Sequence, residues 1–228
     1  MGQGSADFYV RFVPEDGQKP IIGECTDELH PGKKYPRPAG GYPKNYRGED
    51  IVFGWFQVEK FSFGFDVKVD DEGTKTEKPA DKSVGKSSTG QAPHTTTGRA
   101  GGKDDDSSYT RPNVSISKHL DSASTTFWLK NCYEGQALKK VEAEACRSGG
   151  QEGAVKTPFV RLVFEDVYIE TISLSLPEDA LPEESLQFSY TRVQMESIWT
   201  SNETGERKVG RPRSFGWNFE DNAGWAAD

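Results

Sequence analysis

The sequence predicts a mainly β protein: a compact β-barrel of two curved antiparallel sheets, with one α-helix and a long polar loop insertion. Three observations lead to this fold class. Aromatic and β-branched residues alternate with polar ones in most apolar segments, which is the period of a half-buried strand. In two long segments the alternation changes phase, as a β-bulge produces, and bulged strands curve. Only the segment after Asp121 has the spacing of a helix.

Two strands are expected in the N-terminal part of the chain. The first is short and is marked by the alternating residues Phe8, Val10 and Phe12. The second, over 53–67, is longer and half-buried, and its buried phase carries Phe53, Trp55, Phe61, Phe63, Phe65 and Val67. Because the polar residues Gln57 and Glu59 fall on that buried phase, we expect this strand to bend midway.

Two later segments carry the changes of phase. In 158–176 the apolar residues are first Val160, Leu162 and Phe164, then Val167 and Ile169, and then Ile172, Leu174 and Leu176. In 184–199 they are Leu186, Phe188 and Tyr190, followed by Val193 and Met195. One extra residue turns every later side chain to the other face, so both segments are predicted as long, bulged strands. A last strand near the C-terminus carries Phe215, Trp217 and Phe219.

One helix is expected between Asp121, which can cap its N-terminus, and Gly135, which can end it. Its apolar i,i+4 pairs are Ala123–Phe127 and Trp128–Cys132. Thr125 and Thr126 are poor helix formers, so tertiary packing must stabilise this helix more than intrinsic propensity does.

The chain is expected to be a single domain over 1–228 with two irregular insertions. The first, 14–50, is rich in Pro, Gly and Tyr, which suits an irregular segment lying on a surface. The second, 70–112, contains one aliphatic residue beyond Ala, Val84, and one aromatic residue, Tyr109. Such a stretch cannot bury enough apolar surface to offset its ordering entropy, so we expect an extended, mobile loop.

Charge and composition exclude several classes of function. The formal net charge is −8, with 36 acidic and 28 basic residues, so the surface would repel a nucleic-acid backbone. No apolar run reaches the 18 residues that suggest a membrane span, so we expect no direct membrane insertion. The N-terminus shows no Sec-type signal, which places the protein in the cytoplasm at least initially. The three cysteines, Cys25, Cys132 and Cys146, are expected to be reduced thiols.

No motif predicts catalysis, a cofactor or a metal, and no site residue is assigned. Residues 80–87 match a permissive Walker A pattern, but they lie in the polar insertion without a strand before them or a helix after them. The histidines, His30, His94 and His119, show no ligand spacing. A nucleophile elbow and a Cys with a nearby partner are both absent from the sequence. We therefore do not expect an enzyme.

The order of features from Pro112 onward does point to a family. A polar stretch before the helix contains Ser117, Lys118, Asp121, Ala123 and Ser124, and the helix ends at Gly135 before a strand containing Lys139. The later strands contain Phe164, Glu165, Asp166 and Val167, then Glu184, Leu186 and Phe188, and finally Gly216, Trp217 and Asn218. This succession resembles the Hcp family, the haemolysin-coregulated tube proteins of bacterial type VI secretion systems. The resemblance covers 113–219 well, and 7–13 and 51–66 more loosely.

The resemblance implies a hexameric ring of β-barrels around a wide lumen. Rings of the family stack head to tail inside a contractile sheath, and contraction drives the tube, tipped by a spike protein, into a target cell. Small effector proteins are carried in the lumen. The protein would then move from the cytoplasm to the extracellular space or a target cell through the secretion apparatus. The second insertion lies where the family has an extended loop, so we expect 66–112 to contact a neighbouring ring or an accessory protein.

Two other functions fit the same residues. A tail-tube protein of a phage or of another contractile injection system would share the fold and the assembly. A monomeric β-module binding carbohydrate or protein would explain the many aromatic residues, provided that Trp199, Trp217 or Trp225 were exposed on one face.

Overall fold

The computed structural model describes residues 6–36, 39–64, 112–147, 158–199 and 213–227. In this part of the chain ten strands and one short helical segment follow one another: β1 (Ala6–Pro14), β2 (Trp55–Val58), β3 (Lys60–Ser62), β4 (Val114–His119), α1 (Ser124–Phe127) with its π-helical continuation η1 (Trp128–Tyr133), β5 (Leu138–Arg147), β6 (Pro158–Ser175), β7 (Glu183–Ser189), β8 (Arg192–Ser197), β9 (Arg213–Asn218) and β10 (Ala223–Ala227).

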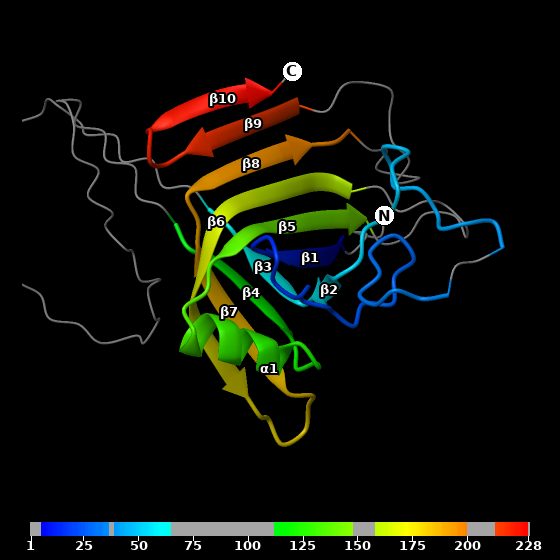
Figure 1. Ribbon diagram of the computed structural model, residues 1–228, viewed down its shortest axis with the longest axis vertical. Coiled ribbons are helices and arrows are strands. Elements are labelled where there is room, and N and C mark those ends of the chain that lie inside the picture. Colours follow the sequence, from blue (N-terminus) through cyan, green and yellow to red (C-terminus); the bar gives the residue numbers. More distant parts are fainter. Residues whose placement is uncertain (1–5, 37–38, 65–111, 148–157, 200–212, 228) are drawn as a thin grey trace, which may run out of the picture.

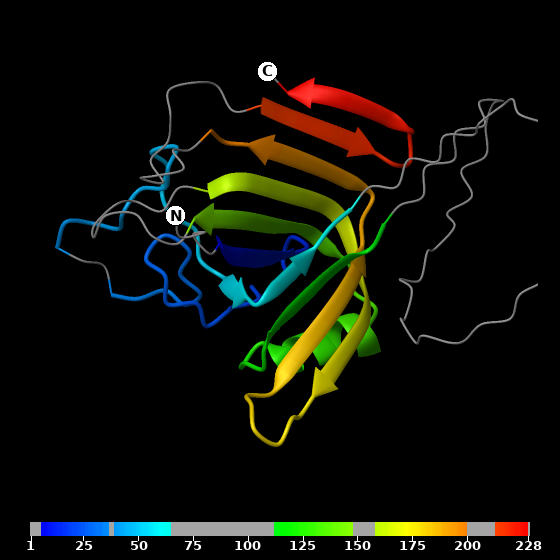
Figure 2. The same cartoon turned by 180° about the vertical axis from the view of Figure 1, so that it is seen from behind.

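Two antiparallel sheets share the long strand β6 (Figures 1 and 2). The large sheet has the order β10-β9-β8-β6-β5-β1-β2, and the small sheet pairs β3 with β4, β4 with β7, and β7 with β6. The first half of β6 pairs with β5 and β8, and its second half pairs with β7. Following the pairings from β1 through β5, β6, β7, β4 and β3 leads back to β2, which precedes β3 by a single residue. The predicted mainly β fold with two curved antiparallel sheets and one helix is confirmed.

The bend in β6 comes from the predicted bulge. Phe164 and Val167 are both buried although three positions separate them, and Asp166 between them has a φ of 53°, which strands do not otherwise adopt. A second register shift lies between Ile169 and Thr171. The changes of phase are therefore real, and they turn β6 from one sheet into the other.

The last apolar phase of β6 is buried only in part. Ile172 is buried, but Leu174 and Leu176 are exposed. The hairpin of β6 and β7 extends past the core (Figure 2), so the apolar side chains at its end are not buried with the rest of the strand.

Two segments predicted as single strands are pairs of strands. Segment 184–199 divides at Tyr190–Thr191 into β7, in the small sheet, and β8, in the large one, and Met195 is exposed. Segment 53–67 divides at Glu59 into β2 and β3. The structural reason is the same in both places: the chain passes from one sheet to the other instead of continuing a ladder.

This division also changes which aromatic residues enter the core. Phe56 and Val58 of β2 are in the main core, whereas Trp55 belongs to a second, smaller cluster on the opposite face of the sheet. Phe61 and Phe63 pack against the main core, as predicted. Residues 65–67 lie outside the described part of the chain.

At the C-terminal end the predicted strand is β9, and β10 pairs with it although no strand was predicted there. Phe215 of β9 is exposed, and Trp217 is half-buried against the core. Phe219 follows the strand and packs with Tyr190 at a ring-centroid distance of 5.5 Å.

The predicted cap is wrong: the helix begins at Ser124 with Ala123 as its N-cap residue, and Asp121 lies in the turn before it. The helix is also shorter than expected, and its second part is a wider, π-helical turn. The Oδ1 atom of Asp121 accepts the backbone N–H of Ala123 at 2.9 Å, and Gly135 adopts a φ of 61° after the last turn. From Trp128 onward the turn is π-helical, with the N–H of Glu134 bonded to the carbonyl of Leu129. The predicted i,i+4 pairing of Trp128 with Cys132 therefore has the wrong period for this turn.

Within 14–36 and 39–50 the structure has no helix and, beyond the end of β1, no strand apart from an isolated bridge between Lys44 and Asp50. This segment lies beside the end of the large sheet that carries β1 and β2 (Figure 1). The expected loop 70–112 falls, except for Pro112, outside the described residues, so the single-domain organisation stays a prediction. In the described residues no helix has the length and apolar character needed to cross a membrane.

Candidate functional site

A fully buried cation joins the helix to the small sheet. The side chain of Lys118, on β4, is 1% exposed, and its Nζ lies 2.9 Å from Glu184 Oε2 on β7 and 3.0 Å from Asp121 Oδ1. The same Nζ donates to Ser124 Oγ and to the carbonyl of His119, both at 3.2 Å. It also lies 5.5 Å from the ring centroid of Phe56.

The anion of this cluster is equally enclosed. Glu184 is 0% exposed and accepts from Ser124 Oγ at 2.8 Å and from Trp128 Nε1 at 3.1 Å. Lys118, Asp121, Ser124 and Glu184, which carried part of the family resemblance, thus meet in one network that we call the lysine anchor. Its role is to hold the helix against the sheet.

A second set of charges covers the outer side of the large sheet. Along β1, β5, β6 and β8, apolar residues face the core and polar residues face outward. The outward set includes Arg11, Glu142, Glu144, Arg161 and Glu196, which we call the charged face. The strand register places Arg11 opposite Glu142, and Arg161 opposite both Glu144 and Glu196. Opposite charges therefore stand directly across from one another.

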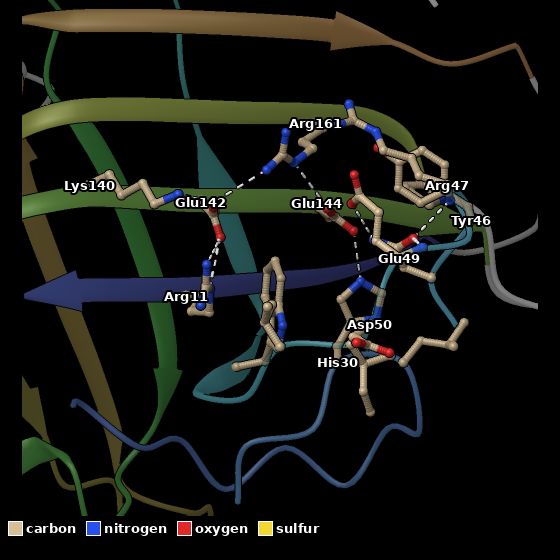
Figure 3. Close-up of a pocket in the computed structure, with 16 residues that line it drawn as sticks. Arg11, His30, Tyr46, Arg47, Glu49, Asp50, Lys140, Glu142, Glu144 and Arg161 are labelled. Carbon is tan, nitrogen blue, oxygen red and sulfur yellow. Dashed lines mark hydrogen bonds and ion pairs between the residues drawn. The ribbon is translucent and has the colours of Figure 1, made fainter. Parts of the chain in front are cut away.

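Each carboxylate of the charged face has more than one cationic partner. Glu142 accepts from Arg11 Nε at 2.8 Å and from Lys140 Nζ at 2.7 Å, and Arg161 reaches it at 3.3 Å (Figure 3). Burial alone raises the pKa of Glu142, but Arg11 and Lys140 outweigh it and leave the pKa below 4.5. Arg161 also reaches Glu144, with Nε 3.3 Å from Oε1. Side chains of opposite sign are thus paired across the charged face, and the lowered pKa keeps Glu142 ionised at neutral pH.

A pocket of about 260 Å³ lies between the charged face and the irregular segment 45–52. Arg47, from that segment, forms an ion pair with Glu196 (Figure 3 shows its side chain in this pocket). Burial, followed by the charges of Glu144 and Glu196, raises the pKa of Tyr46 to about 12. Charged side chains of both signs line the pocket in ion pairs. The ion pair between Arg47 and Glu196 attaches segment 45–52 to the large sheet.

His30 occupies the floor of this region. The N–H groups of Leu29 and His30 both donate to Asp27 Oδ1, which turns the chain so that the imidazole points at β5. The ring stacks on Tyr9, with centroids 4.1 Å apart and an interplanar angle of 2°. Its Nε2 lies 2.9 Å from Glu144 Oε2 (Figure 3).

The protonation of His30 is set by two opposing effects. Burial is the largest and lowers its pKa, but hydrogen bonds to Asp27, Cys146 and Glu144 more than offset it and raise the pKa to about 11. The pKa of the neighbouring thiol, Cys146, is also raised, and burial is the largest cause. A buried thiol of raised pKa is a poor nucleophile.

The sequence assigned no site residue, and neither of these networks was predicted. His30 and Glu144 are 114 positions apart, so the spacing of histidines could not reveal their contact. A signal did exist in the alternation of β5, where two glutamates and a cysteine, Glu142, Glu144 and Cys146, share one face of a buried strand. Acidic residues at such positions require partners. Of the expected reduced thiols, Cys25 and Cys146 form no disulfide within the described residues, and the side chain of Cys132 is outside the described set.

The tryptophans that a carbohydrate-binding face would need differ in how far they are exposed. Trp199 is 67% exposed, and Trp217 is half-buried and packs against the core. The side chain of Trp225 lies outside the described set.

Comparisons with known proteins agree with the resemblance in the sequence. The family model described as "Type VI secretion system effector, Hcp" matches residues 83–196, half of the chain. A search of curated proteins finds no match. Among solved structures, one titled "Structure of a type six secretion system protein" has a TM-score of 0.61 at 16% identity, covering 97% of this chain and 100% of that one.

A second solved structure, Hcp1 from Salmonella typhimurium, has a TM-score of 0.52 at 14% identity and covers 96% of this chain and 99% of that one. At these identities the two structures establish a shared fold. The matched segment, 83–196, runs from before β4 to the second-last residue of β8 and includes the lysine anchor and the bulge of β6. This chain belongs to the Hcp family of type VI secretion.

Proposed function

We propose that the protein is the tube subunit of a type VI secretion system, assembling into hexameric rings that stack head to tail. The observation that carries this proposal is the family match over 83–196, which contains β4 to β7 and nearly all of β8. Membership of this family favours a tube of type VI secretion over a phage tail tube or a monomeric carbohydrate-binding module.

A ring of identical subunits requires two different, complementary surfaces on each subunit. One candidate lies where the hairpin of β6 and β7 extends beside the helix (Figures 1 and 2). Large apolar side chains are exposed there: Leu174, Leu176, Leu181, Trp128, Leu129 and Tyr133. Apolar groups gathered in this way mark contact surfaces, so we assign this end of the barrel to the ring interface.

The remaining partners follow from the same proposal. A contractile sheath would surround the tube, a spike protein would tip it, and small effector proteins would occupy its lumen. Segment 66–112 would contact the neighbouring ring or an accessory protein. The protein would reach the outside through the apparatus, and it would act as a building block and not as an enzyme.

Secretion by the native bacterium tests this function. The protein should appear in the medium only while the sheath genes are intact, because sheath contraction expels the tube. Leu176→Asp and Leu181→Asp should abolish that release by placing charge in the ring interface, whereas Ile22→Asp, at an exposed apolar residue of the irregular segment, should not. Release that persists without the sheath would contradict the proposal.

A further inference from the structure

Three side chains with different donor atoms converge beneath the pocket. A nitrogen of His30, a carboxylate oxygen of Glu144 and the Sγ of Cys146 all lie within 4.8 Å of one another, and all three residues are buried. We propose that these residues bind a divalent transition-metal ion of the zinc type, which would fasten the loop around His30 to β5. This site concerns the subunit alone and does not depend on the proposed function.

The imidazole is already oriented for such a role. Asp27 Oδ1 lies 3.1 Å from His30 Nδ1, and Tyr9 donates its hydroxyl to Asp27 Oδ2 at 3.2 Å. A carboxylate on the far nitrogen of a histidine is the usual outer partner in metal sites, because it fixes the ring and leaves Nε2 for the ion. The stacking of the ring on Tyr9 restricts it further.

The backbone on both sides of the cluster is well fixed. Glu144 and Cys146 are two positions apart on β5, so their side chains leave the strand on the same face. On the opposite side, the N–H of Gly32 bonds to the carbonyl of Cys25 at 2.8 Å, and the N–H of Gly54 bonds to the carbonyl of Gly32 at 2.9 Å. A Cβ at Gly32 would come within 2.2 Å of the carbonyl oxygen of Gly23, so this close packing requires glycine.

The distances between the ligand atoms need only small adjustments to suit an ion. With bonds of about 2.0–2.3 Å, the ligand atoms of a tetrahedral zinc site stand about 3.3–3.8 Å apart. The separation of His30 Nε2 from Glu144 Oε2, 2.9 Å, is already shorter than this, and the cluster as a whole spans at most 4.8 Å. A tetrahedral site would therefore widen the His30–Glu144 separation slightly and shorten the longest separation by at most about 1 Å.

The donor set selects the class of ion. Imidazole and thiolate favour Zn²⁺ or Co²⁺, whereas Mg²⁺ and Ca²⁺ require oxygen ligands in greater number. Binding would release one proton from His30 and one from the Cys146 thiol while bringing in two positive charges. The net charge of this buried cluster would therefore stay the same, and no uncompensated charge would be left in the interior.

The pocket provides access for a fourth ligand. His30 and Glu144 both line it, as does Trp55, whose ring meets the His30 ring edge-on at a centroid distance of 4.9 Å. The indole Nε1 of Trp55 is buried and has no hydrogen-bond partner among the described residues. A water molecule entering with the ion would give this region a polar group that such a donor needs.

Cobalt titration of the full-length protein tests the site. The protein is treated with a chelator, kept reduced with a phosphine, and titrated with Co²⁺ alone. We expect one ion per chain and a thiolate-to-cobalt charge-transfer band in the near ultraviolet, which added Zn²⁺ abolishes and Mg²⁺ does not change. Cys146→Ser should remove the band, and Cys132→Ser, the matched change in η1, should keep it.

Histidine variants provide the second readout. His30→Asn should weaken Co²⁺ binding at least ~10-fold, and the exposed His119→Asn should leave it unchanged. Asp27→Asn should keep the band and weaken binding ~10–100-fold, as expected of a positioning residue. If His30→Asn fails to fold, the two cysteine variants still decide. A wild-type protein without a saturable band, or a band that survives in Cys146→Ser, would overturn the proposal.

Discussion

Replacing Lys118 by Met should be among the most damaging single changes in this protein. The substitution keeps most of the side-chain volume and removes a cation that is 1% exposed. Glu184, which is 0% exposed, and Asp121 would then lose the partner that lies 2.9–3.0 Å from each of them. This change destabilises the folded state because it leaves a buried carboxylate without its cation.

The loss of stability in Lys118→Met depends on which hydrogen bonds Glu184 keeps. Removing one partner of a buried ion pair costs roughly 3–5 kcal/mol. Glu184 would still accept from Ser124 and Trp128, so the lower half of that range is expected for Lys118→Met. This is a large part of the roughly 5–15 kcal/mol by which a domain is stable.

Urea unfolding followed by circular dichroism measures this loss. The double variant Lys118→Met/Glu184→Gln should recover part of it, because both charges are then gone. The control is Lys139→Met, which removes an exposed lysine paired with Asp16 and should leave the midpoint nearly unchanged. If Lys118→Met behaved like that control, the account of the lysine anchor would be refuted.

Four further predictions follow from the structure. The pKa of His30 is raised from 6.5 to about 11, so the stabilising contribution of His30 should be complete below pH 6.5 and be lost as the pH rises toward 11. Unfolding titrations with chelator present should show this fall in the free energy of unfolding in the wild type and not in His30→Asn. The pKa of Glu142 is lowered from 4.5, so the stabilising contribution of Glu142 should be present above pH 4.5 and be lost as the pH falls through the lowered pKa. Glu142→Gln should therefore lower the free energy of unfolding at pH 7 and have little effect in acid. An equal loss of stability at both pH values would contradict the ion-pair account. Asp166→Val should lower the free energy of unfolding by about 1–2 kcal/mol, because the φ of 53° is strained for a β-branched residue, whereas Asp166→Gly should not, and equal urea midpoints would argue against strain at the bulge. Deleting 72–108 should leave the far-ultraviolet dichroism of the strands intact, because little apolar area is lost, and a collapse of that signal would show that the segment belongs to the core.

The parts of the fold that depend on local periodicity were predictable from the sequence. The alternation of Phe8, Val10 and Phe12 located β1, and the missing step between Phe164 and Val167 located the bulge. Both signals come from the two-residue repeat of a strand, which is local. The family resemblance was visible in the sequence because it depends on the order of motifs along the chain, which include the residues of the lysine anchor.

The parts that depend on contacts between distant segments were not predictable. Alternation along 184–199 is the same whether one bulged strand or two strands in different sheets produce it, so the break at Tyr190 was missed. The exposure of Leu174 and Leu176 depends on where the core ends, which no local pattern records. The contact of His30 with Glu144 joins a loop to a strand far along the chain, and only the fold brings them together.

The mass of the purified protein by light scattering, followed by negative-stain imaging, tests the central claim most directly. Six chains of 25.3 kDa form a ring of roughly 152 kDa, and we expect that mass together with ring-shaped projections. A monomer of 25.3 kDa that persists at high concentration would contradict the assignment of this chain as a self-assembling tube subunit.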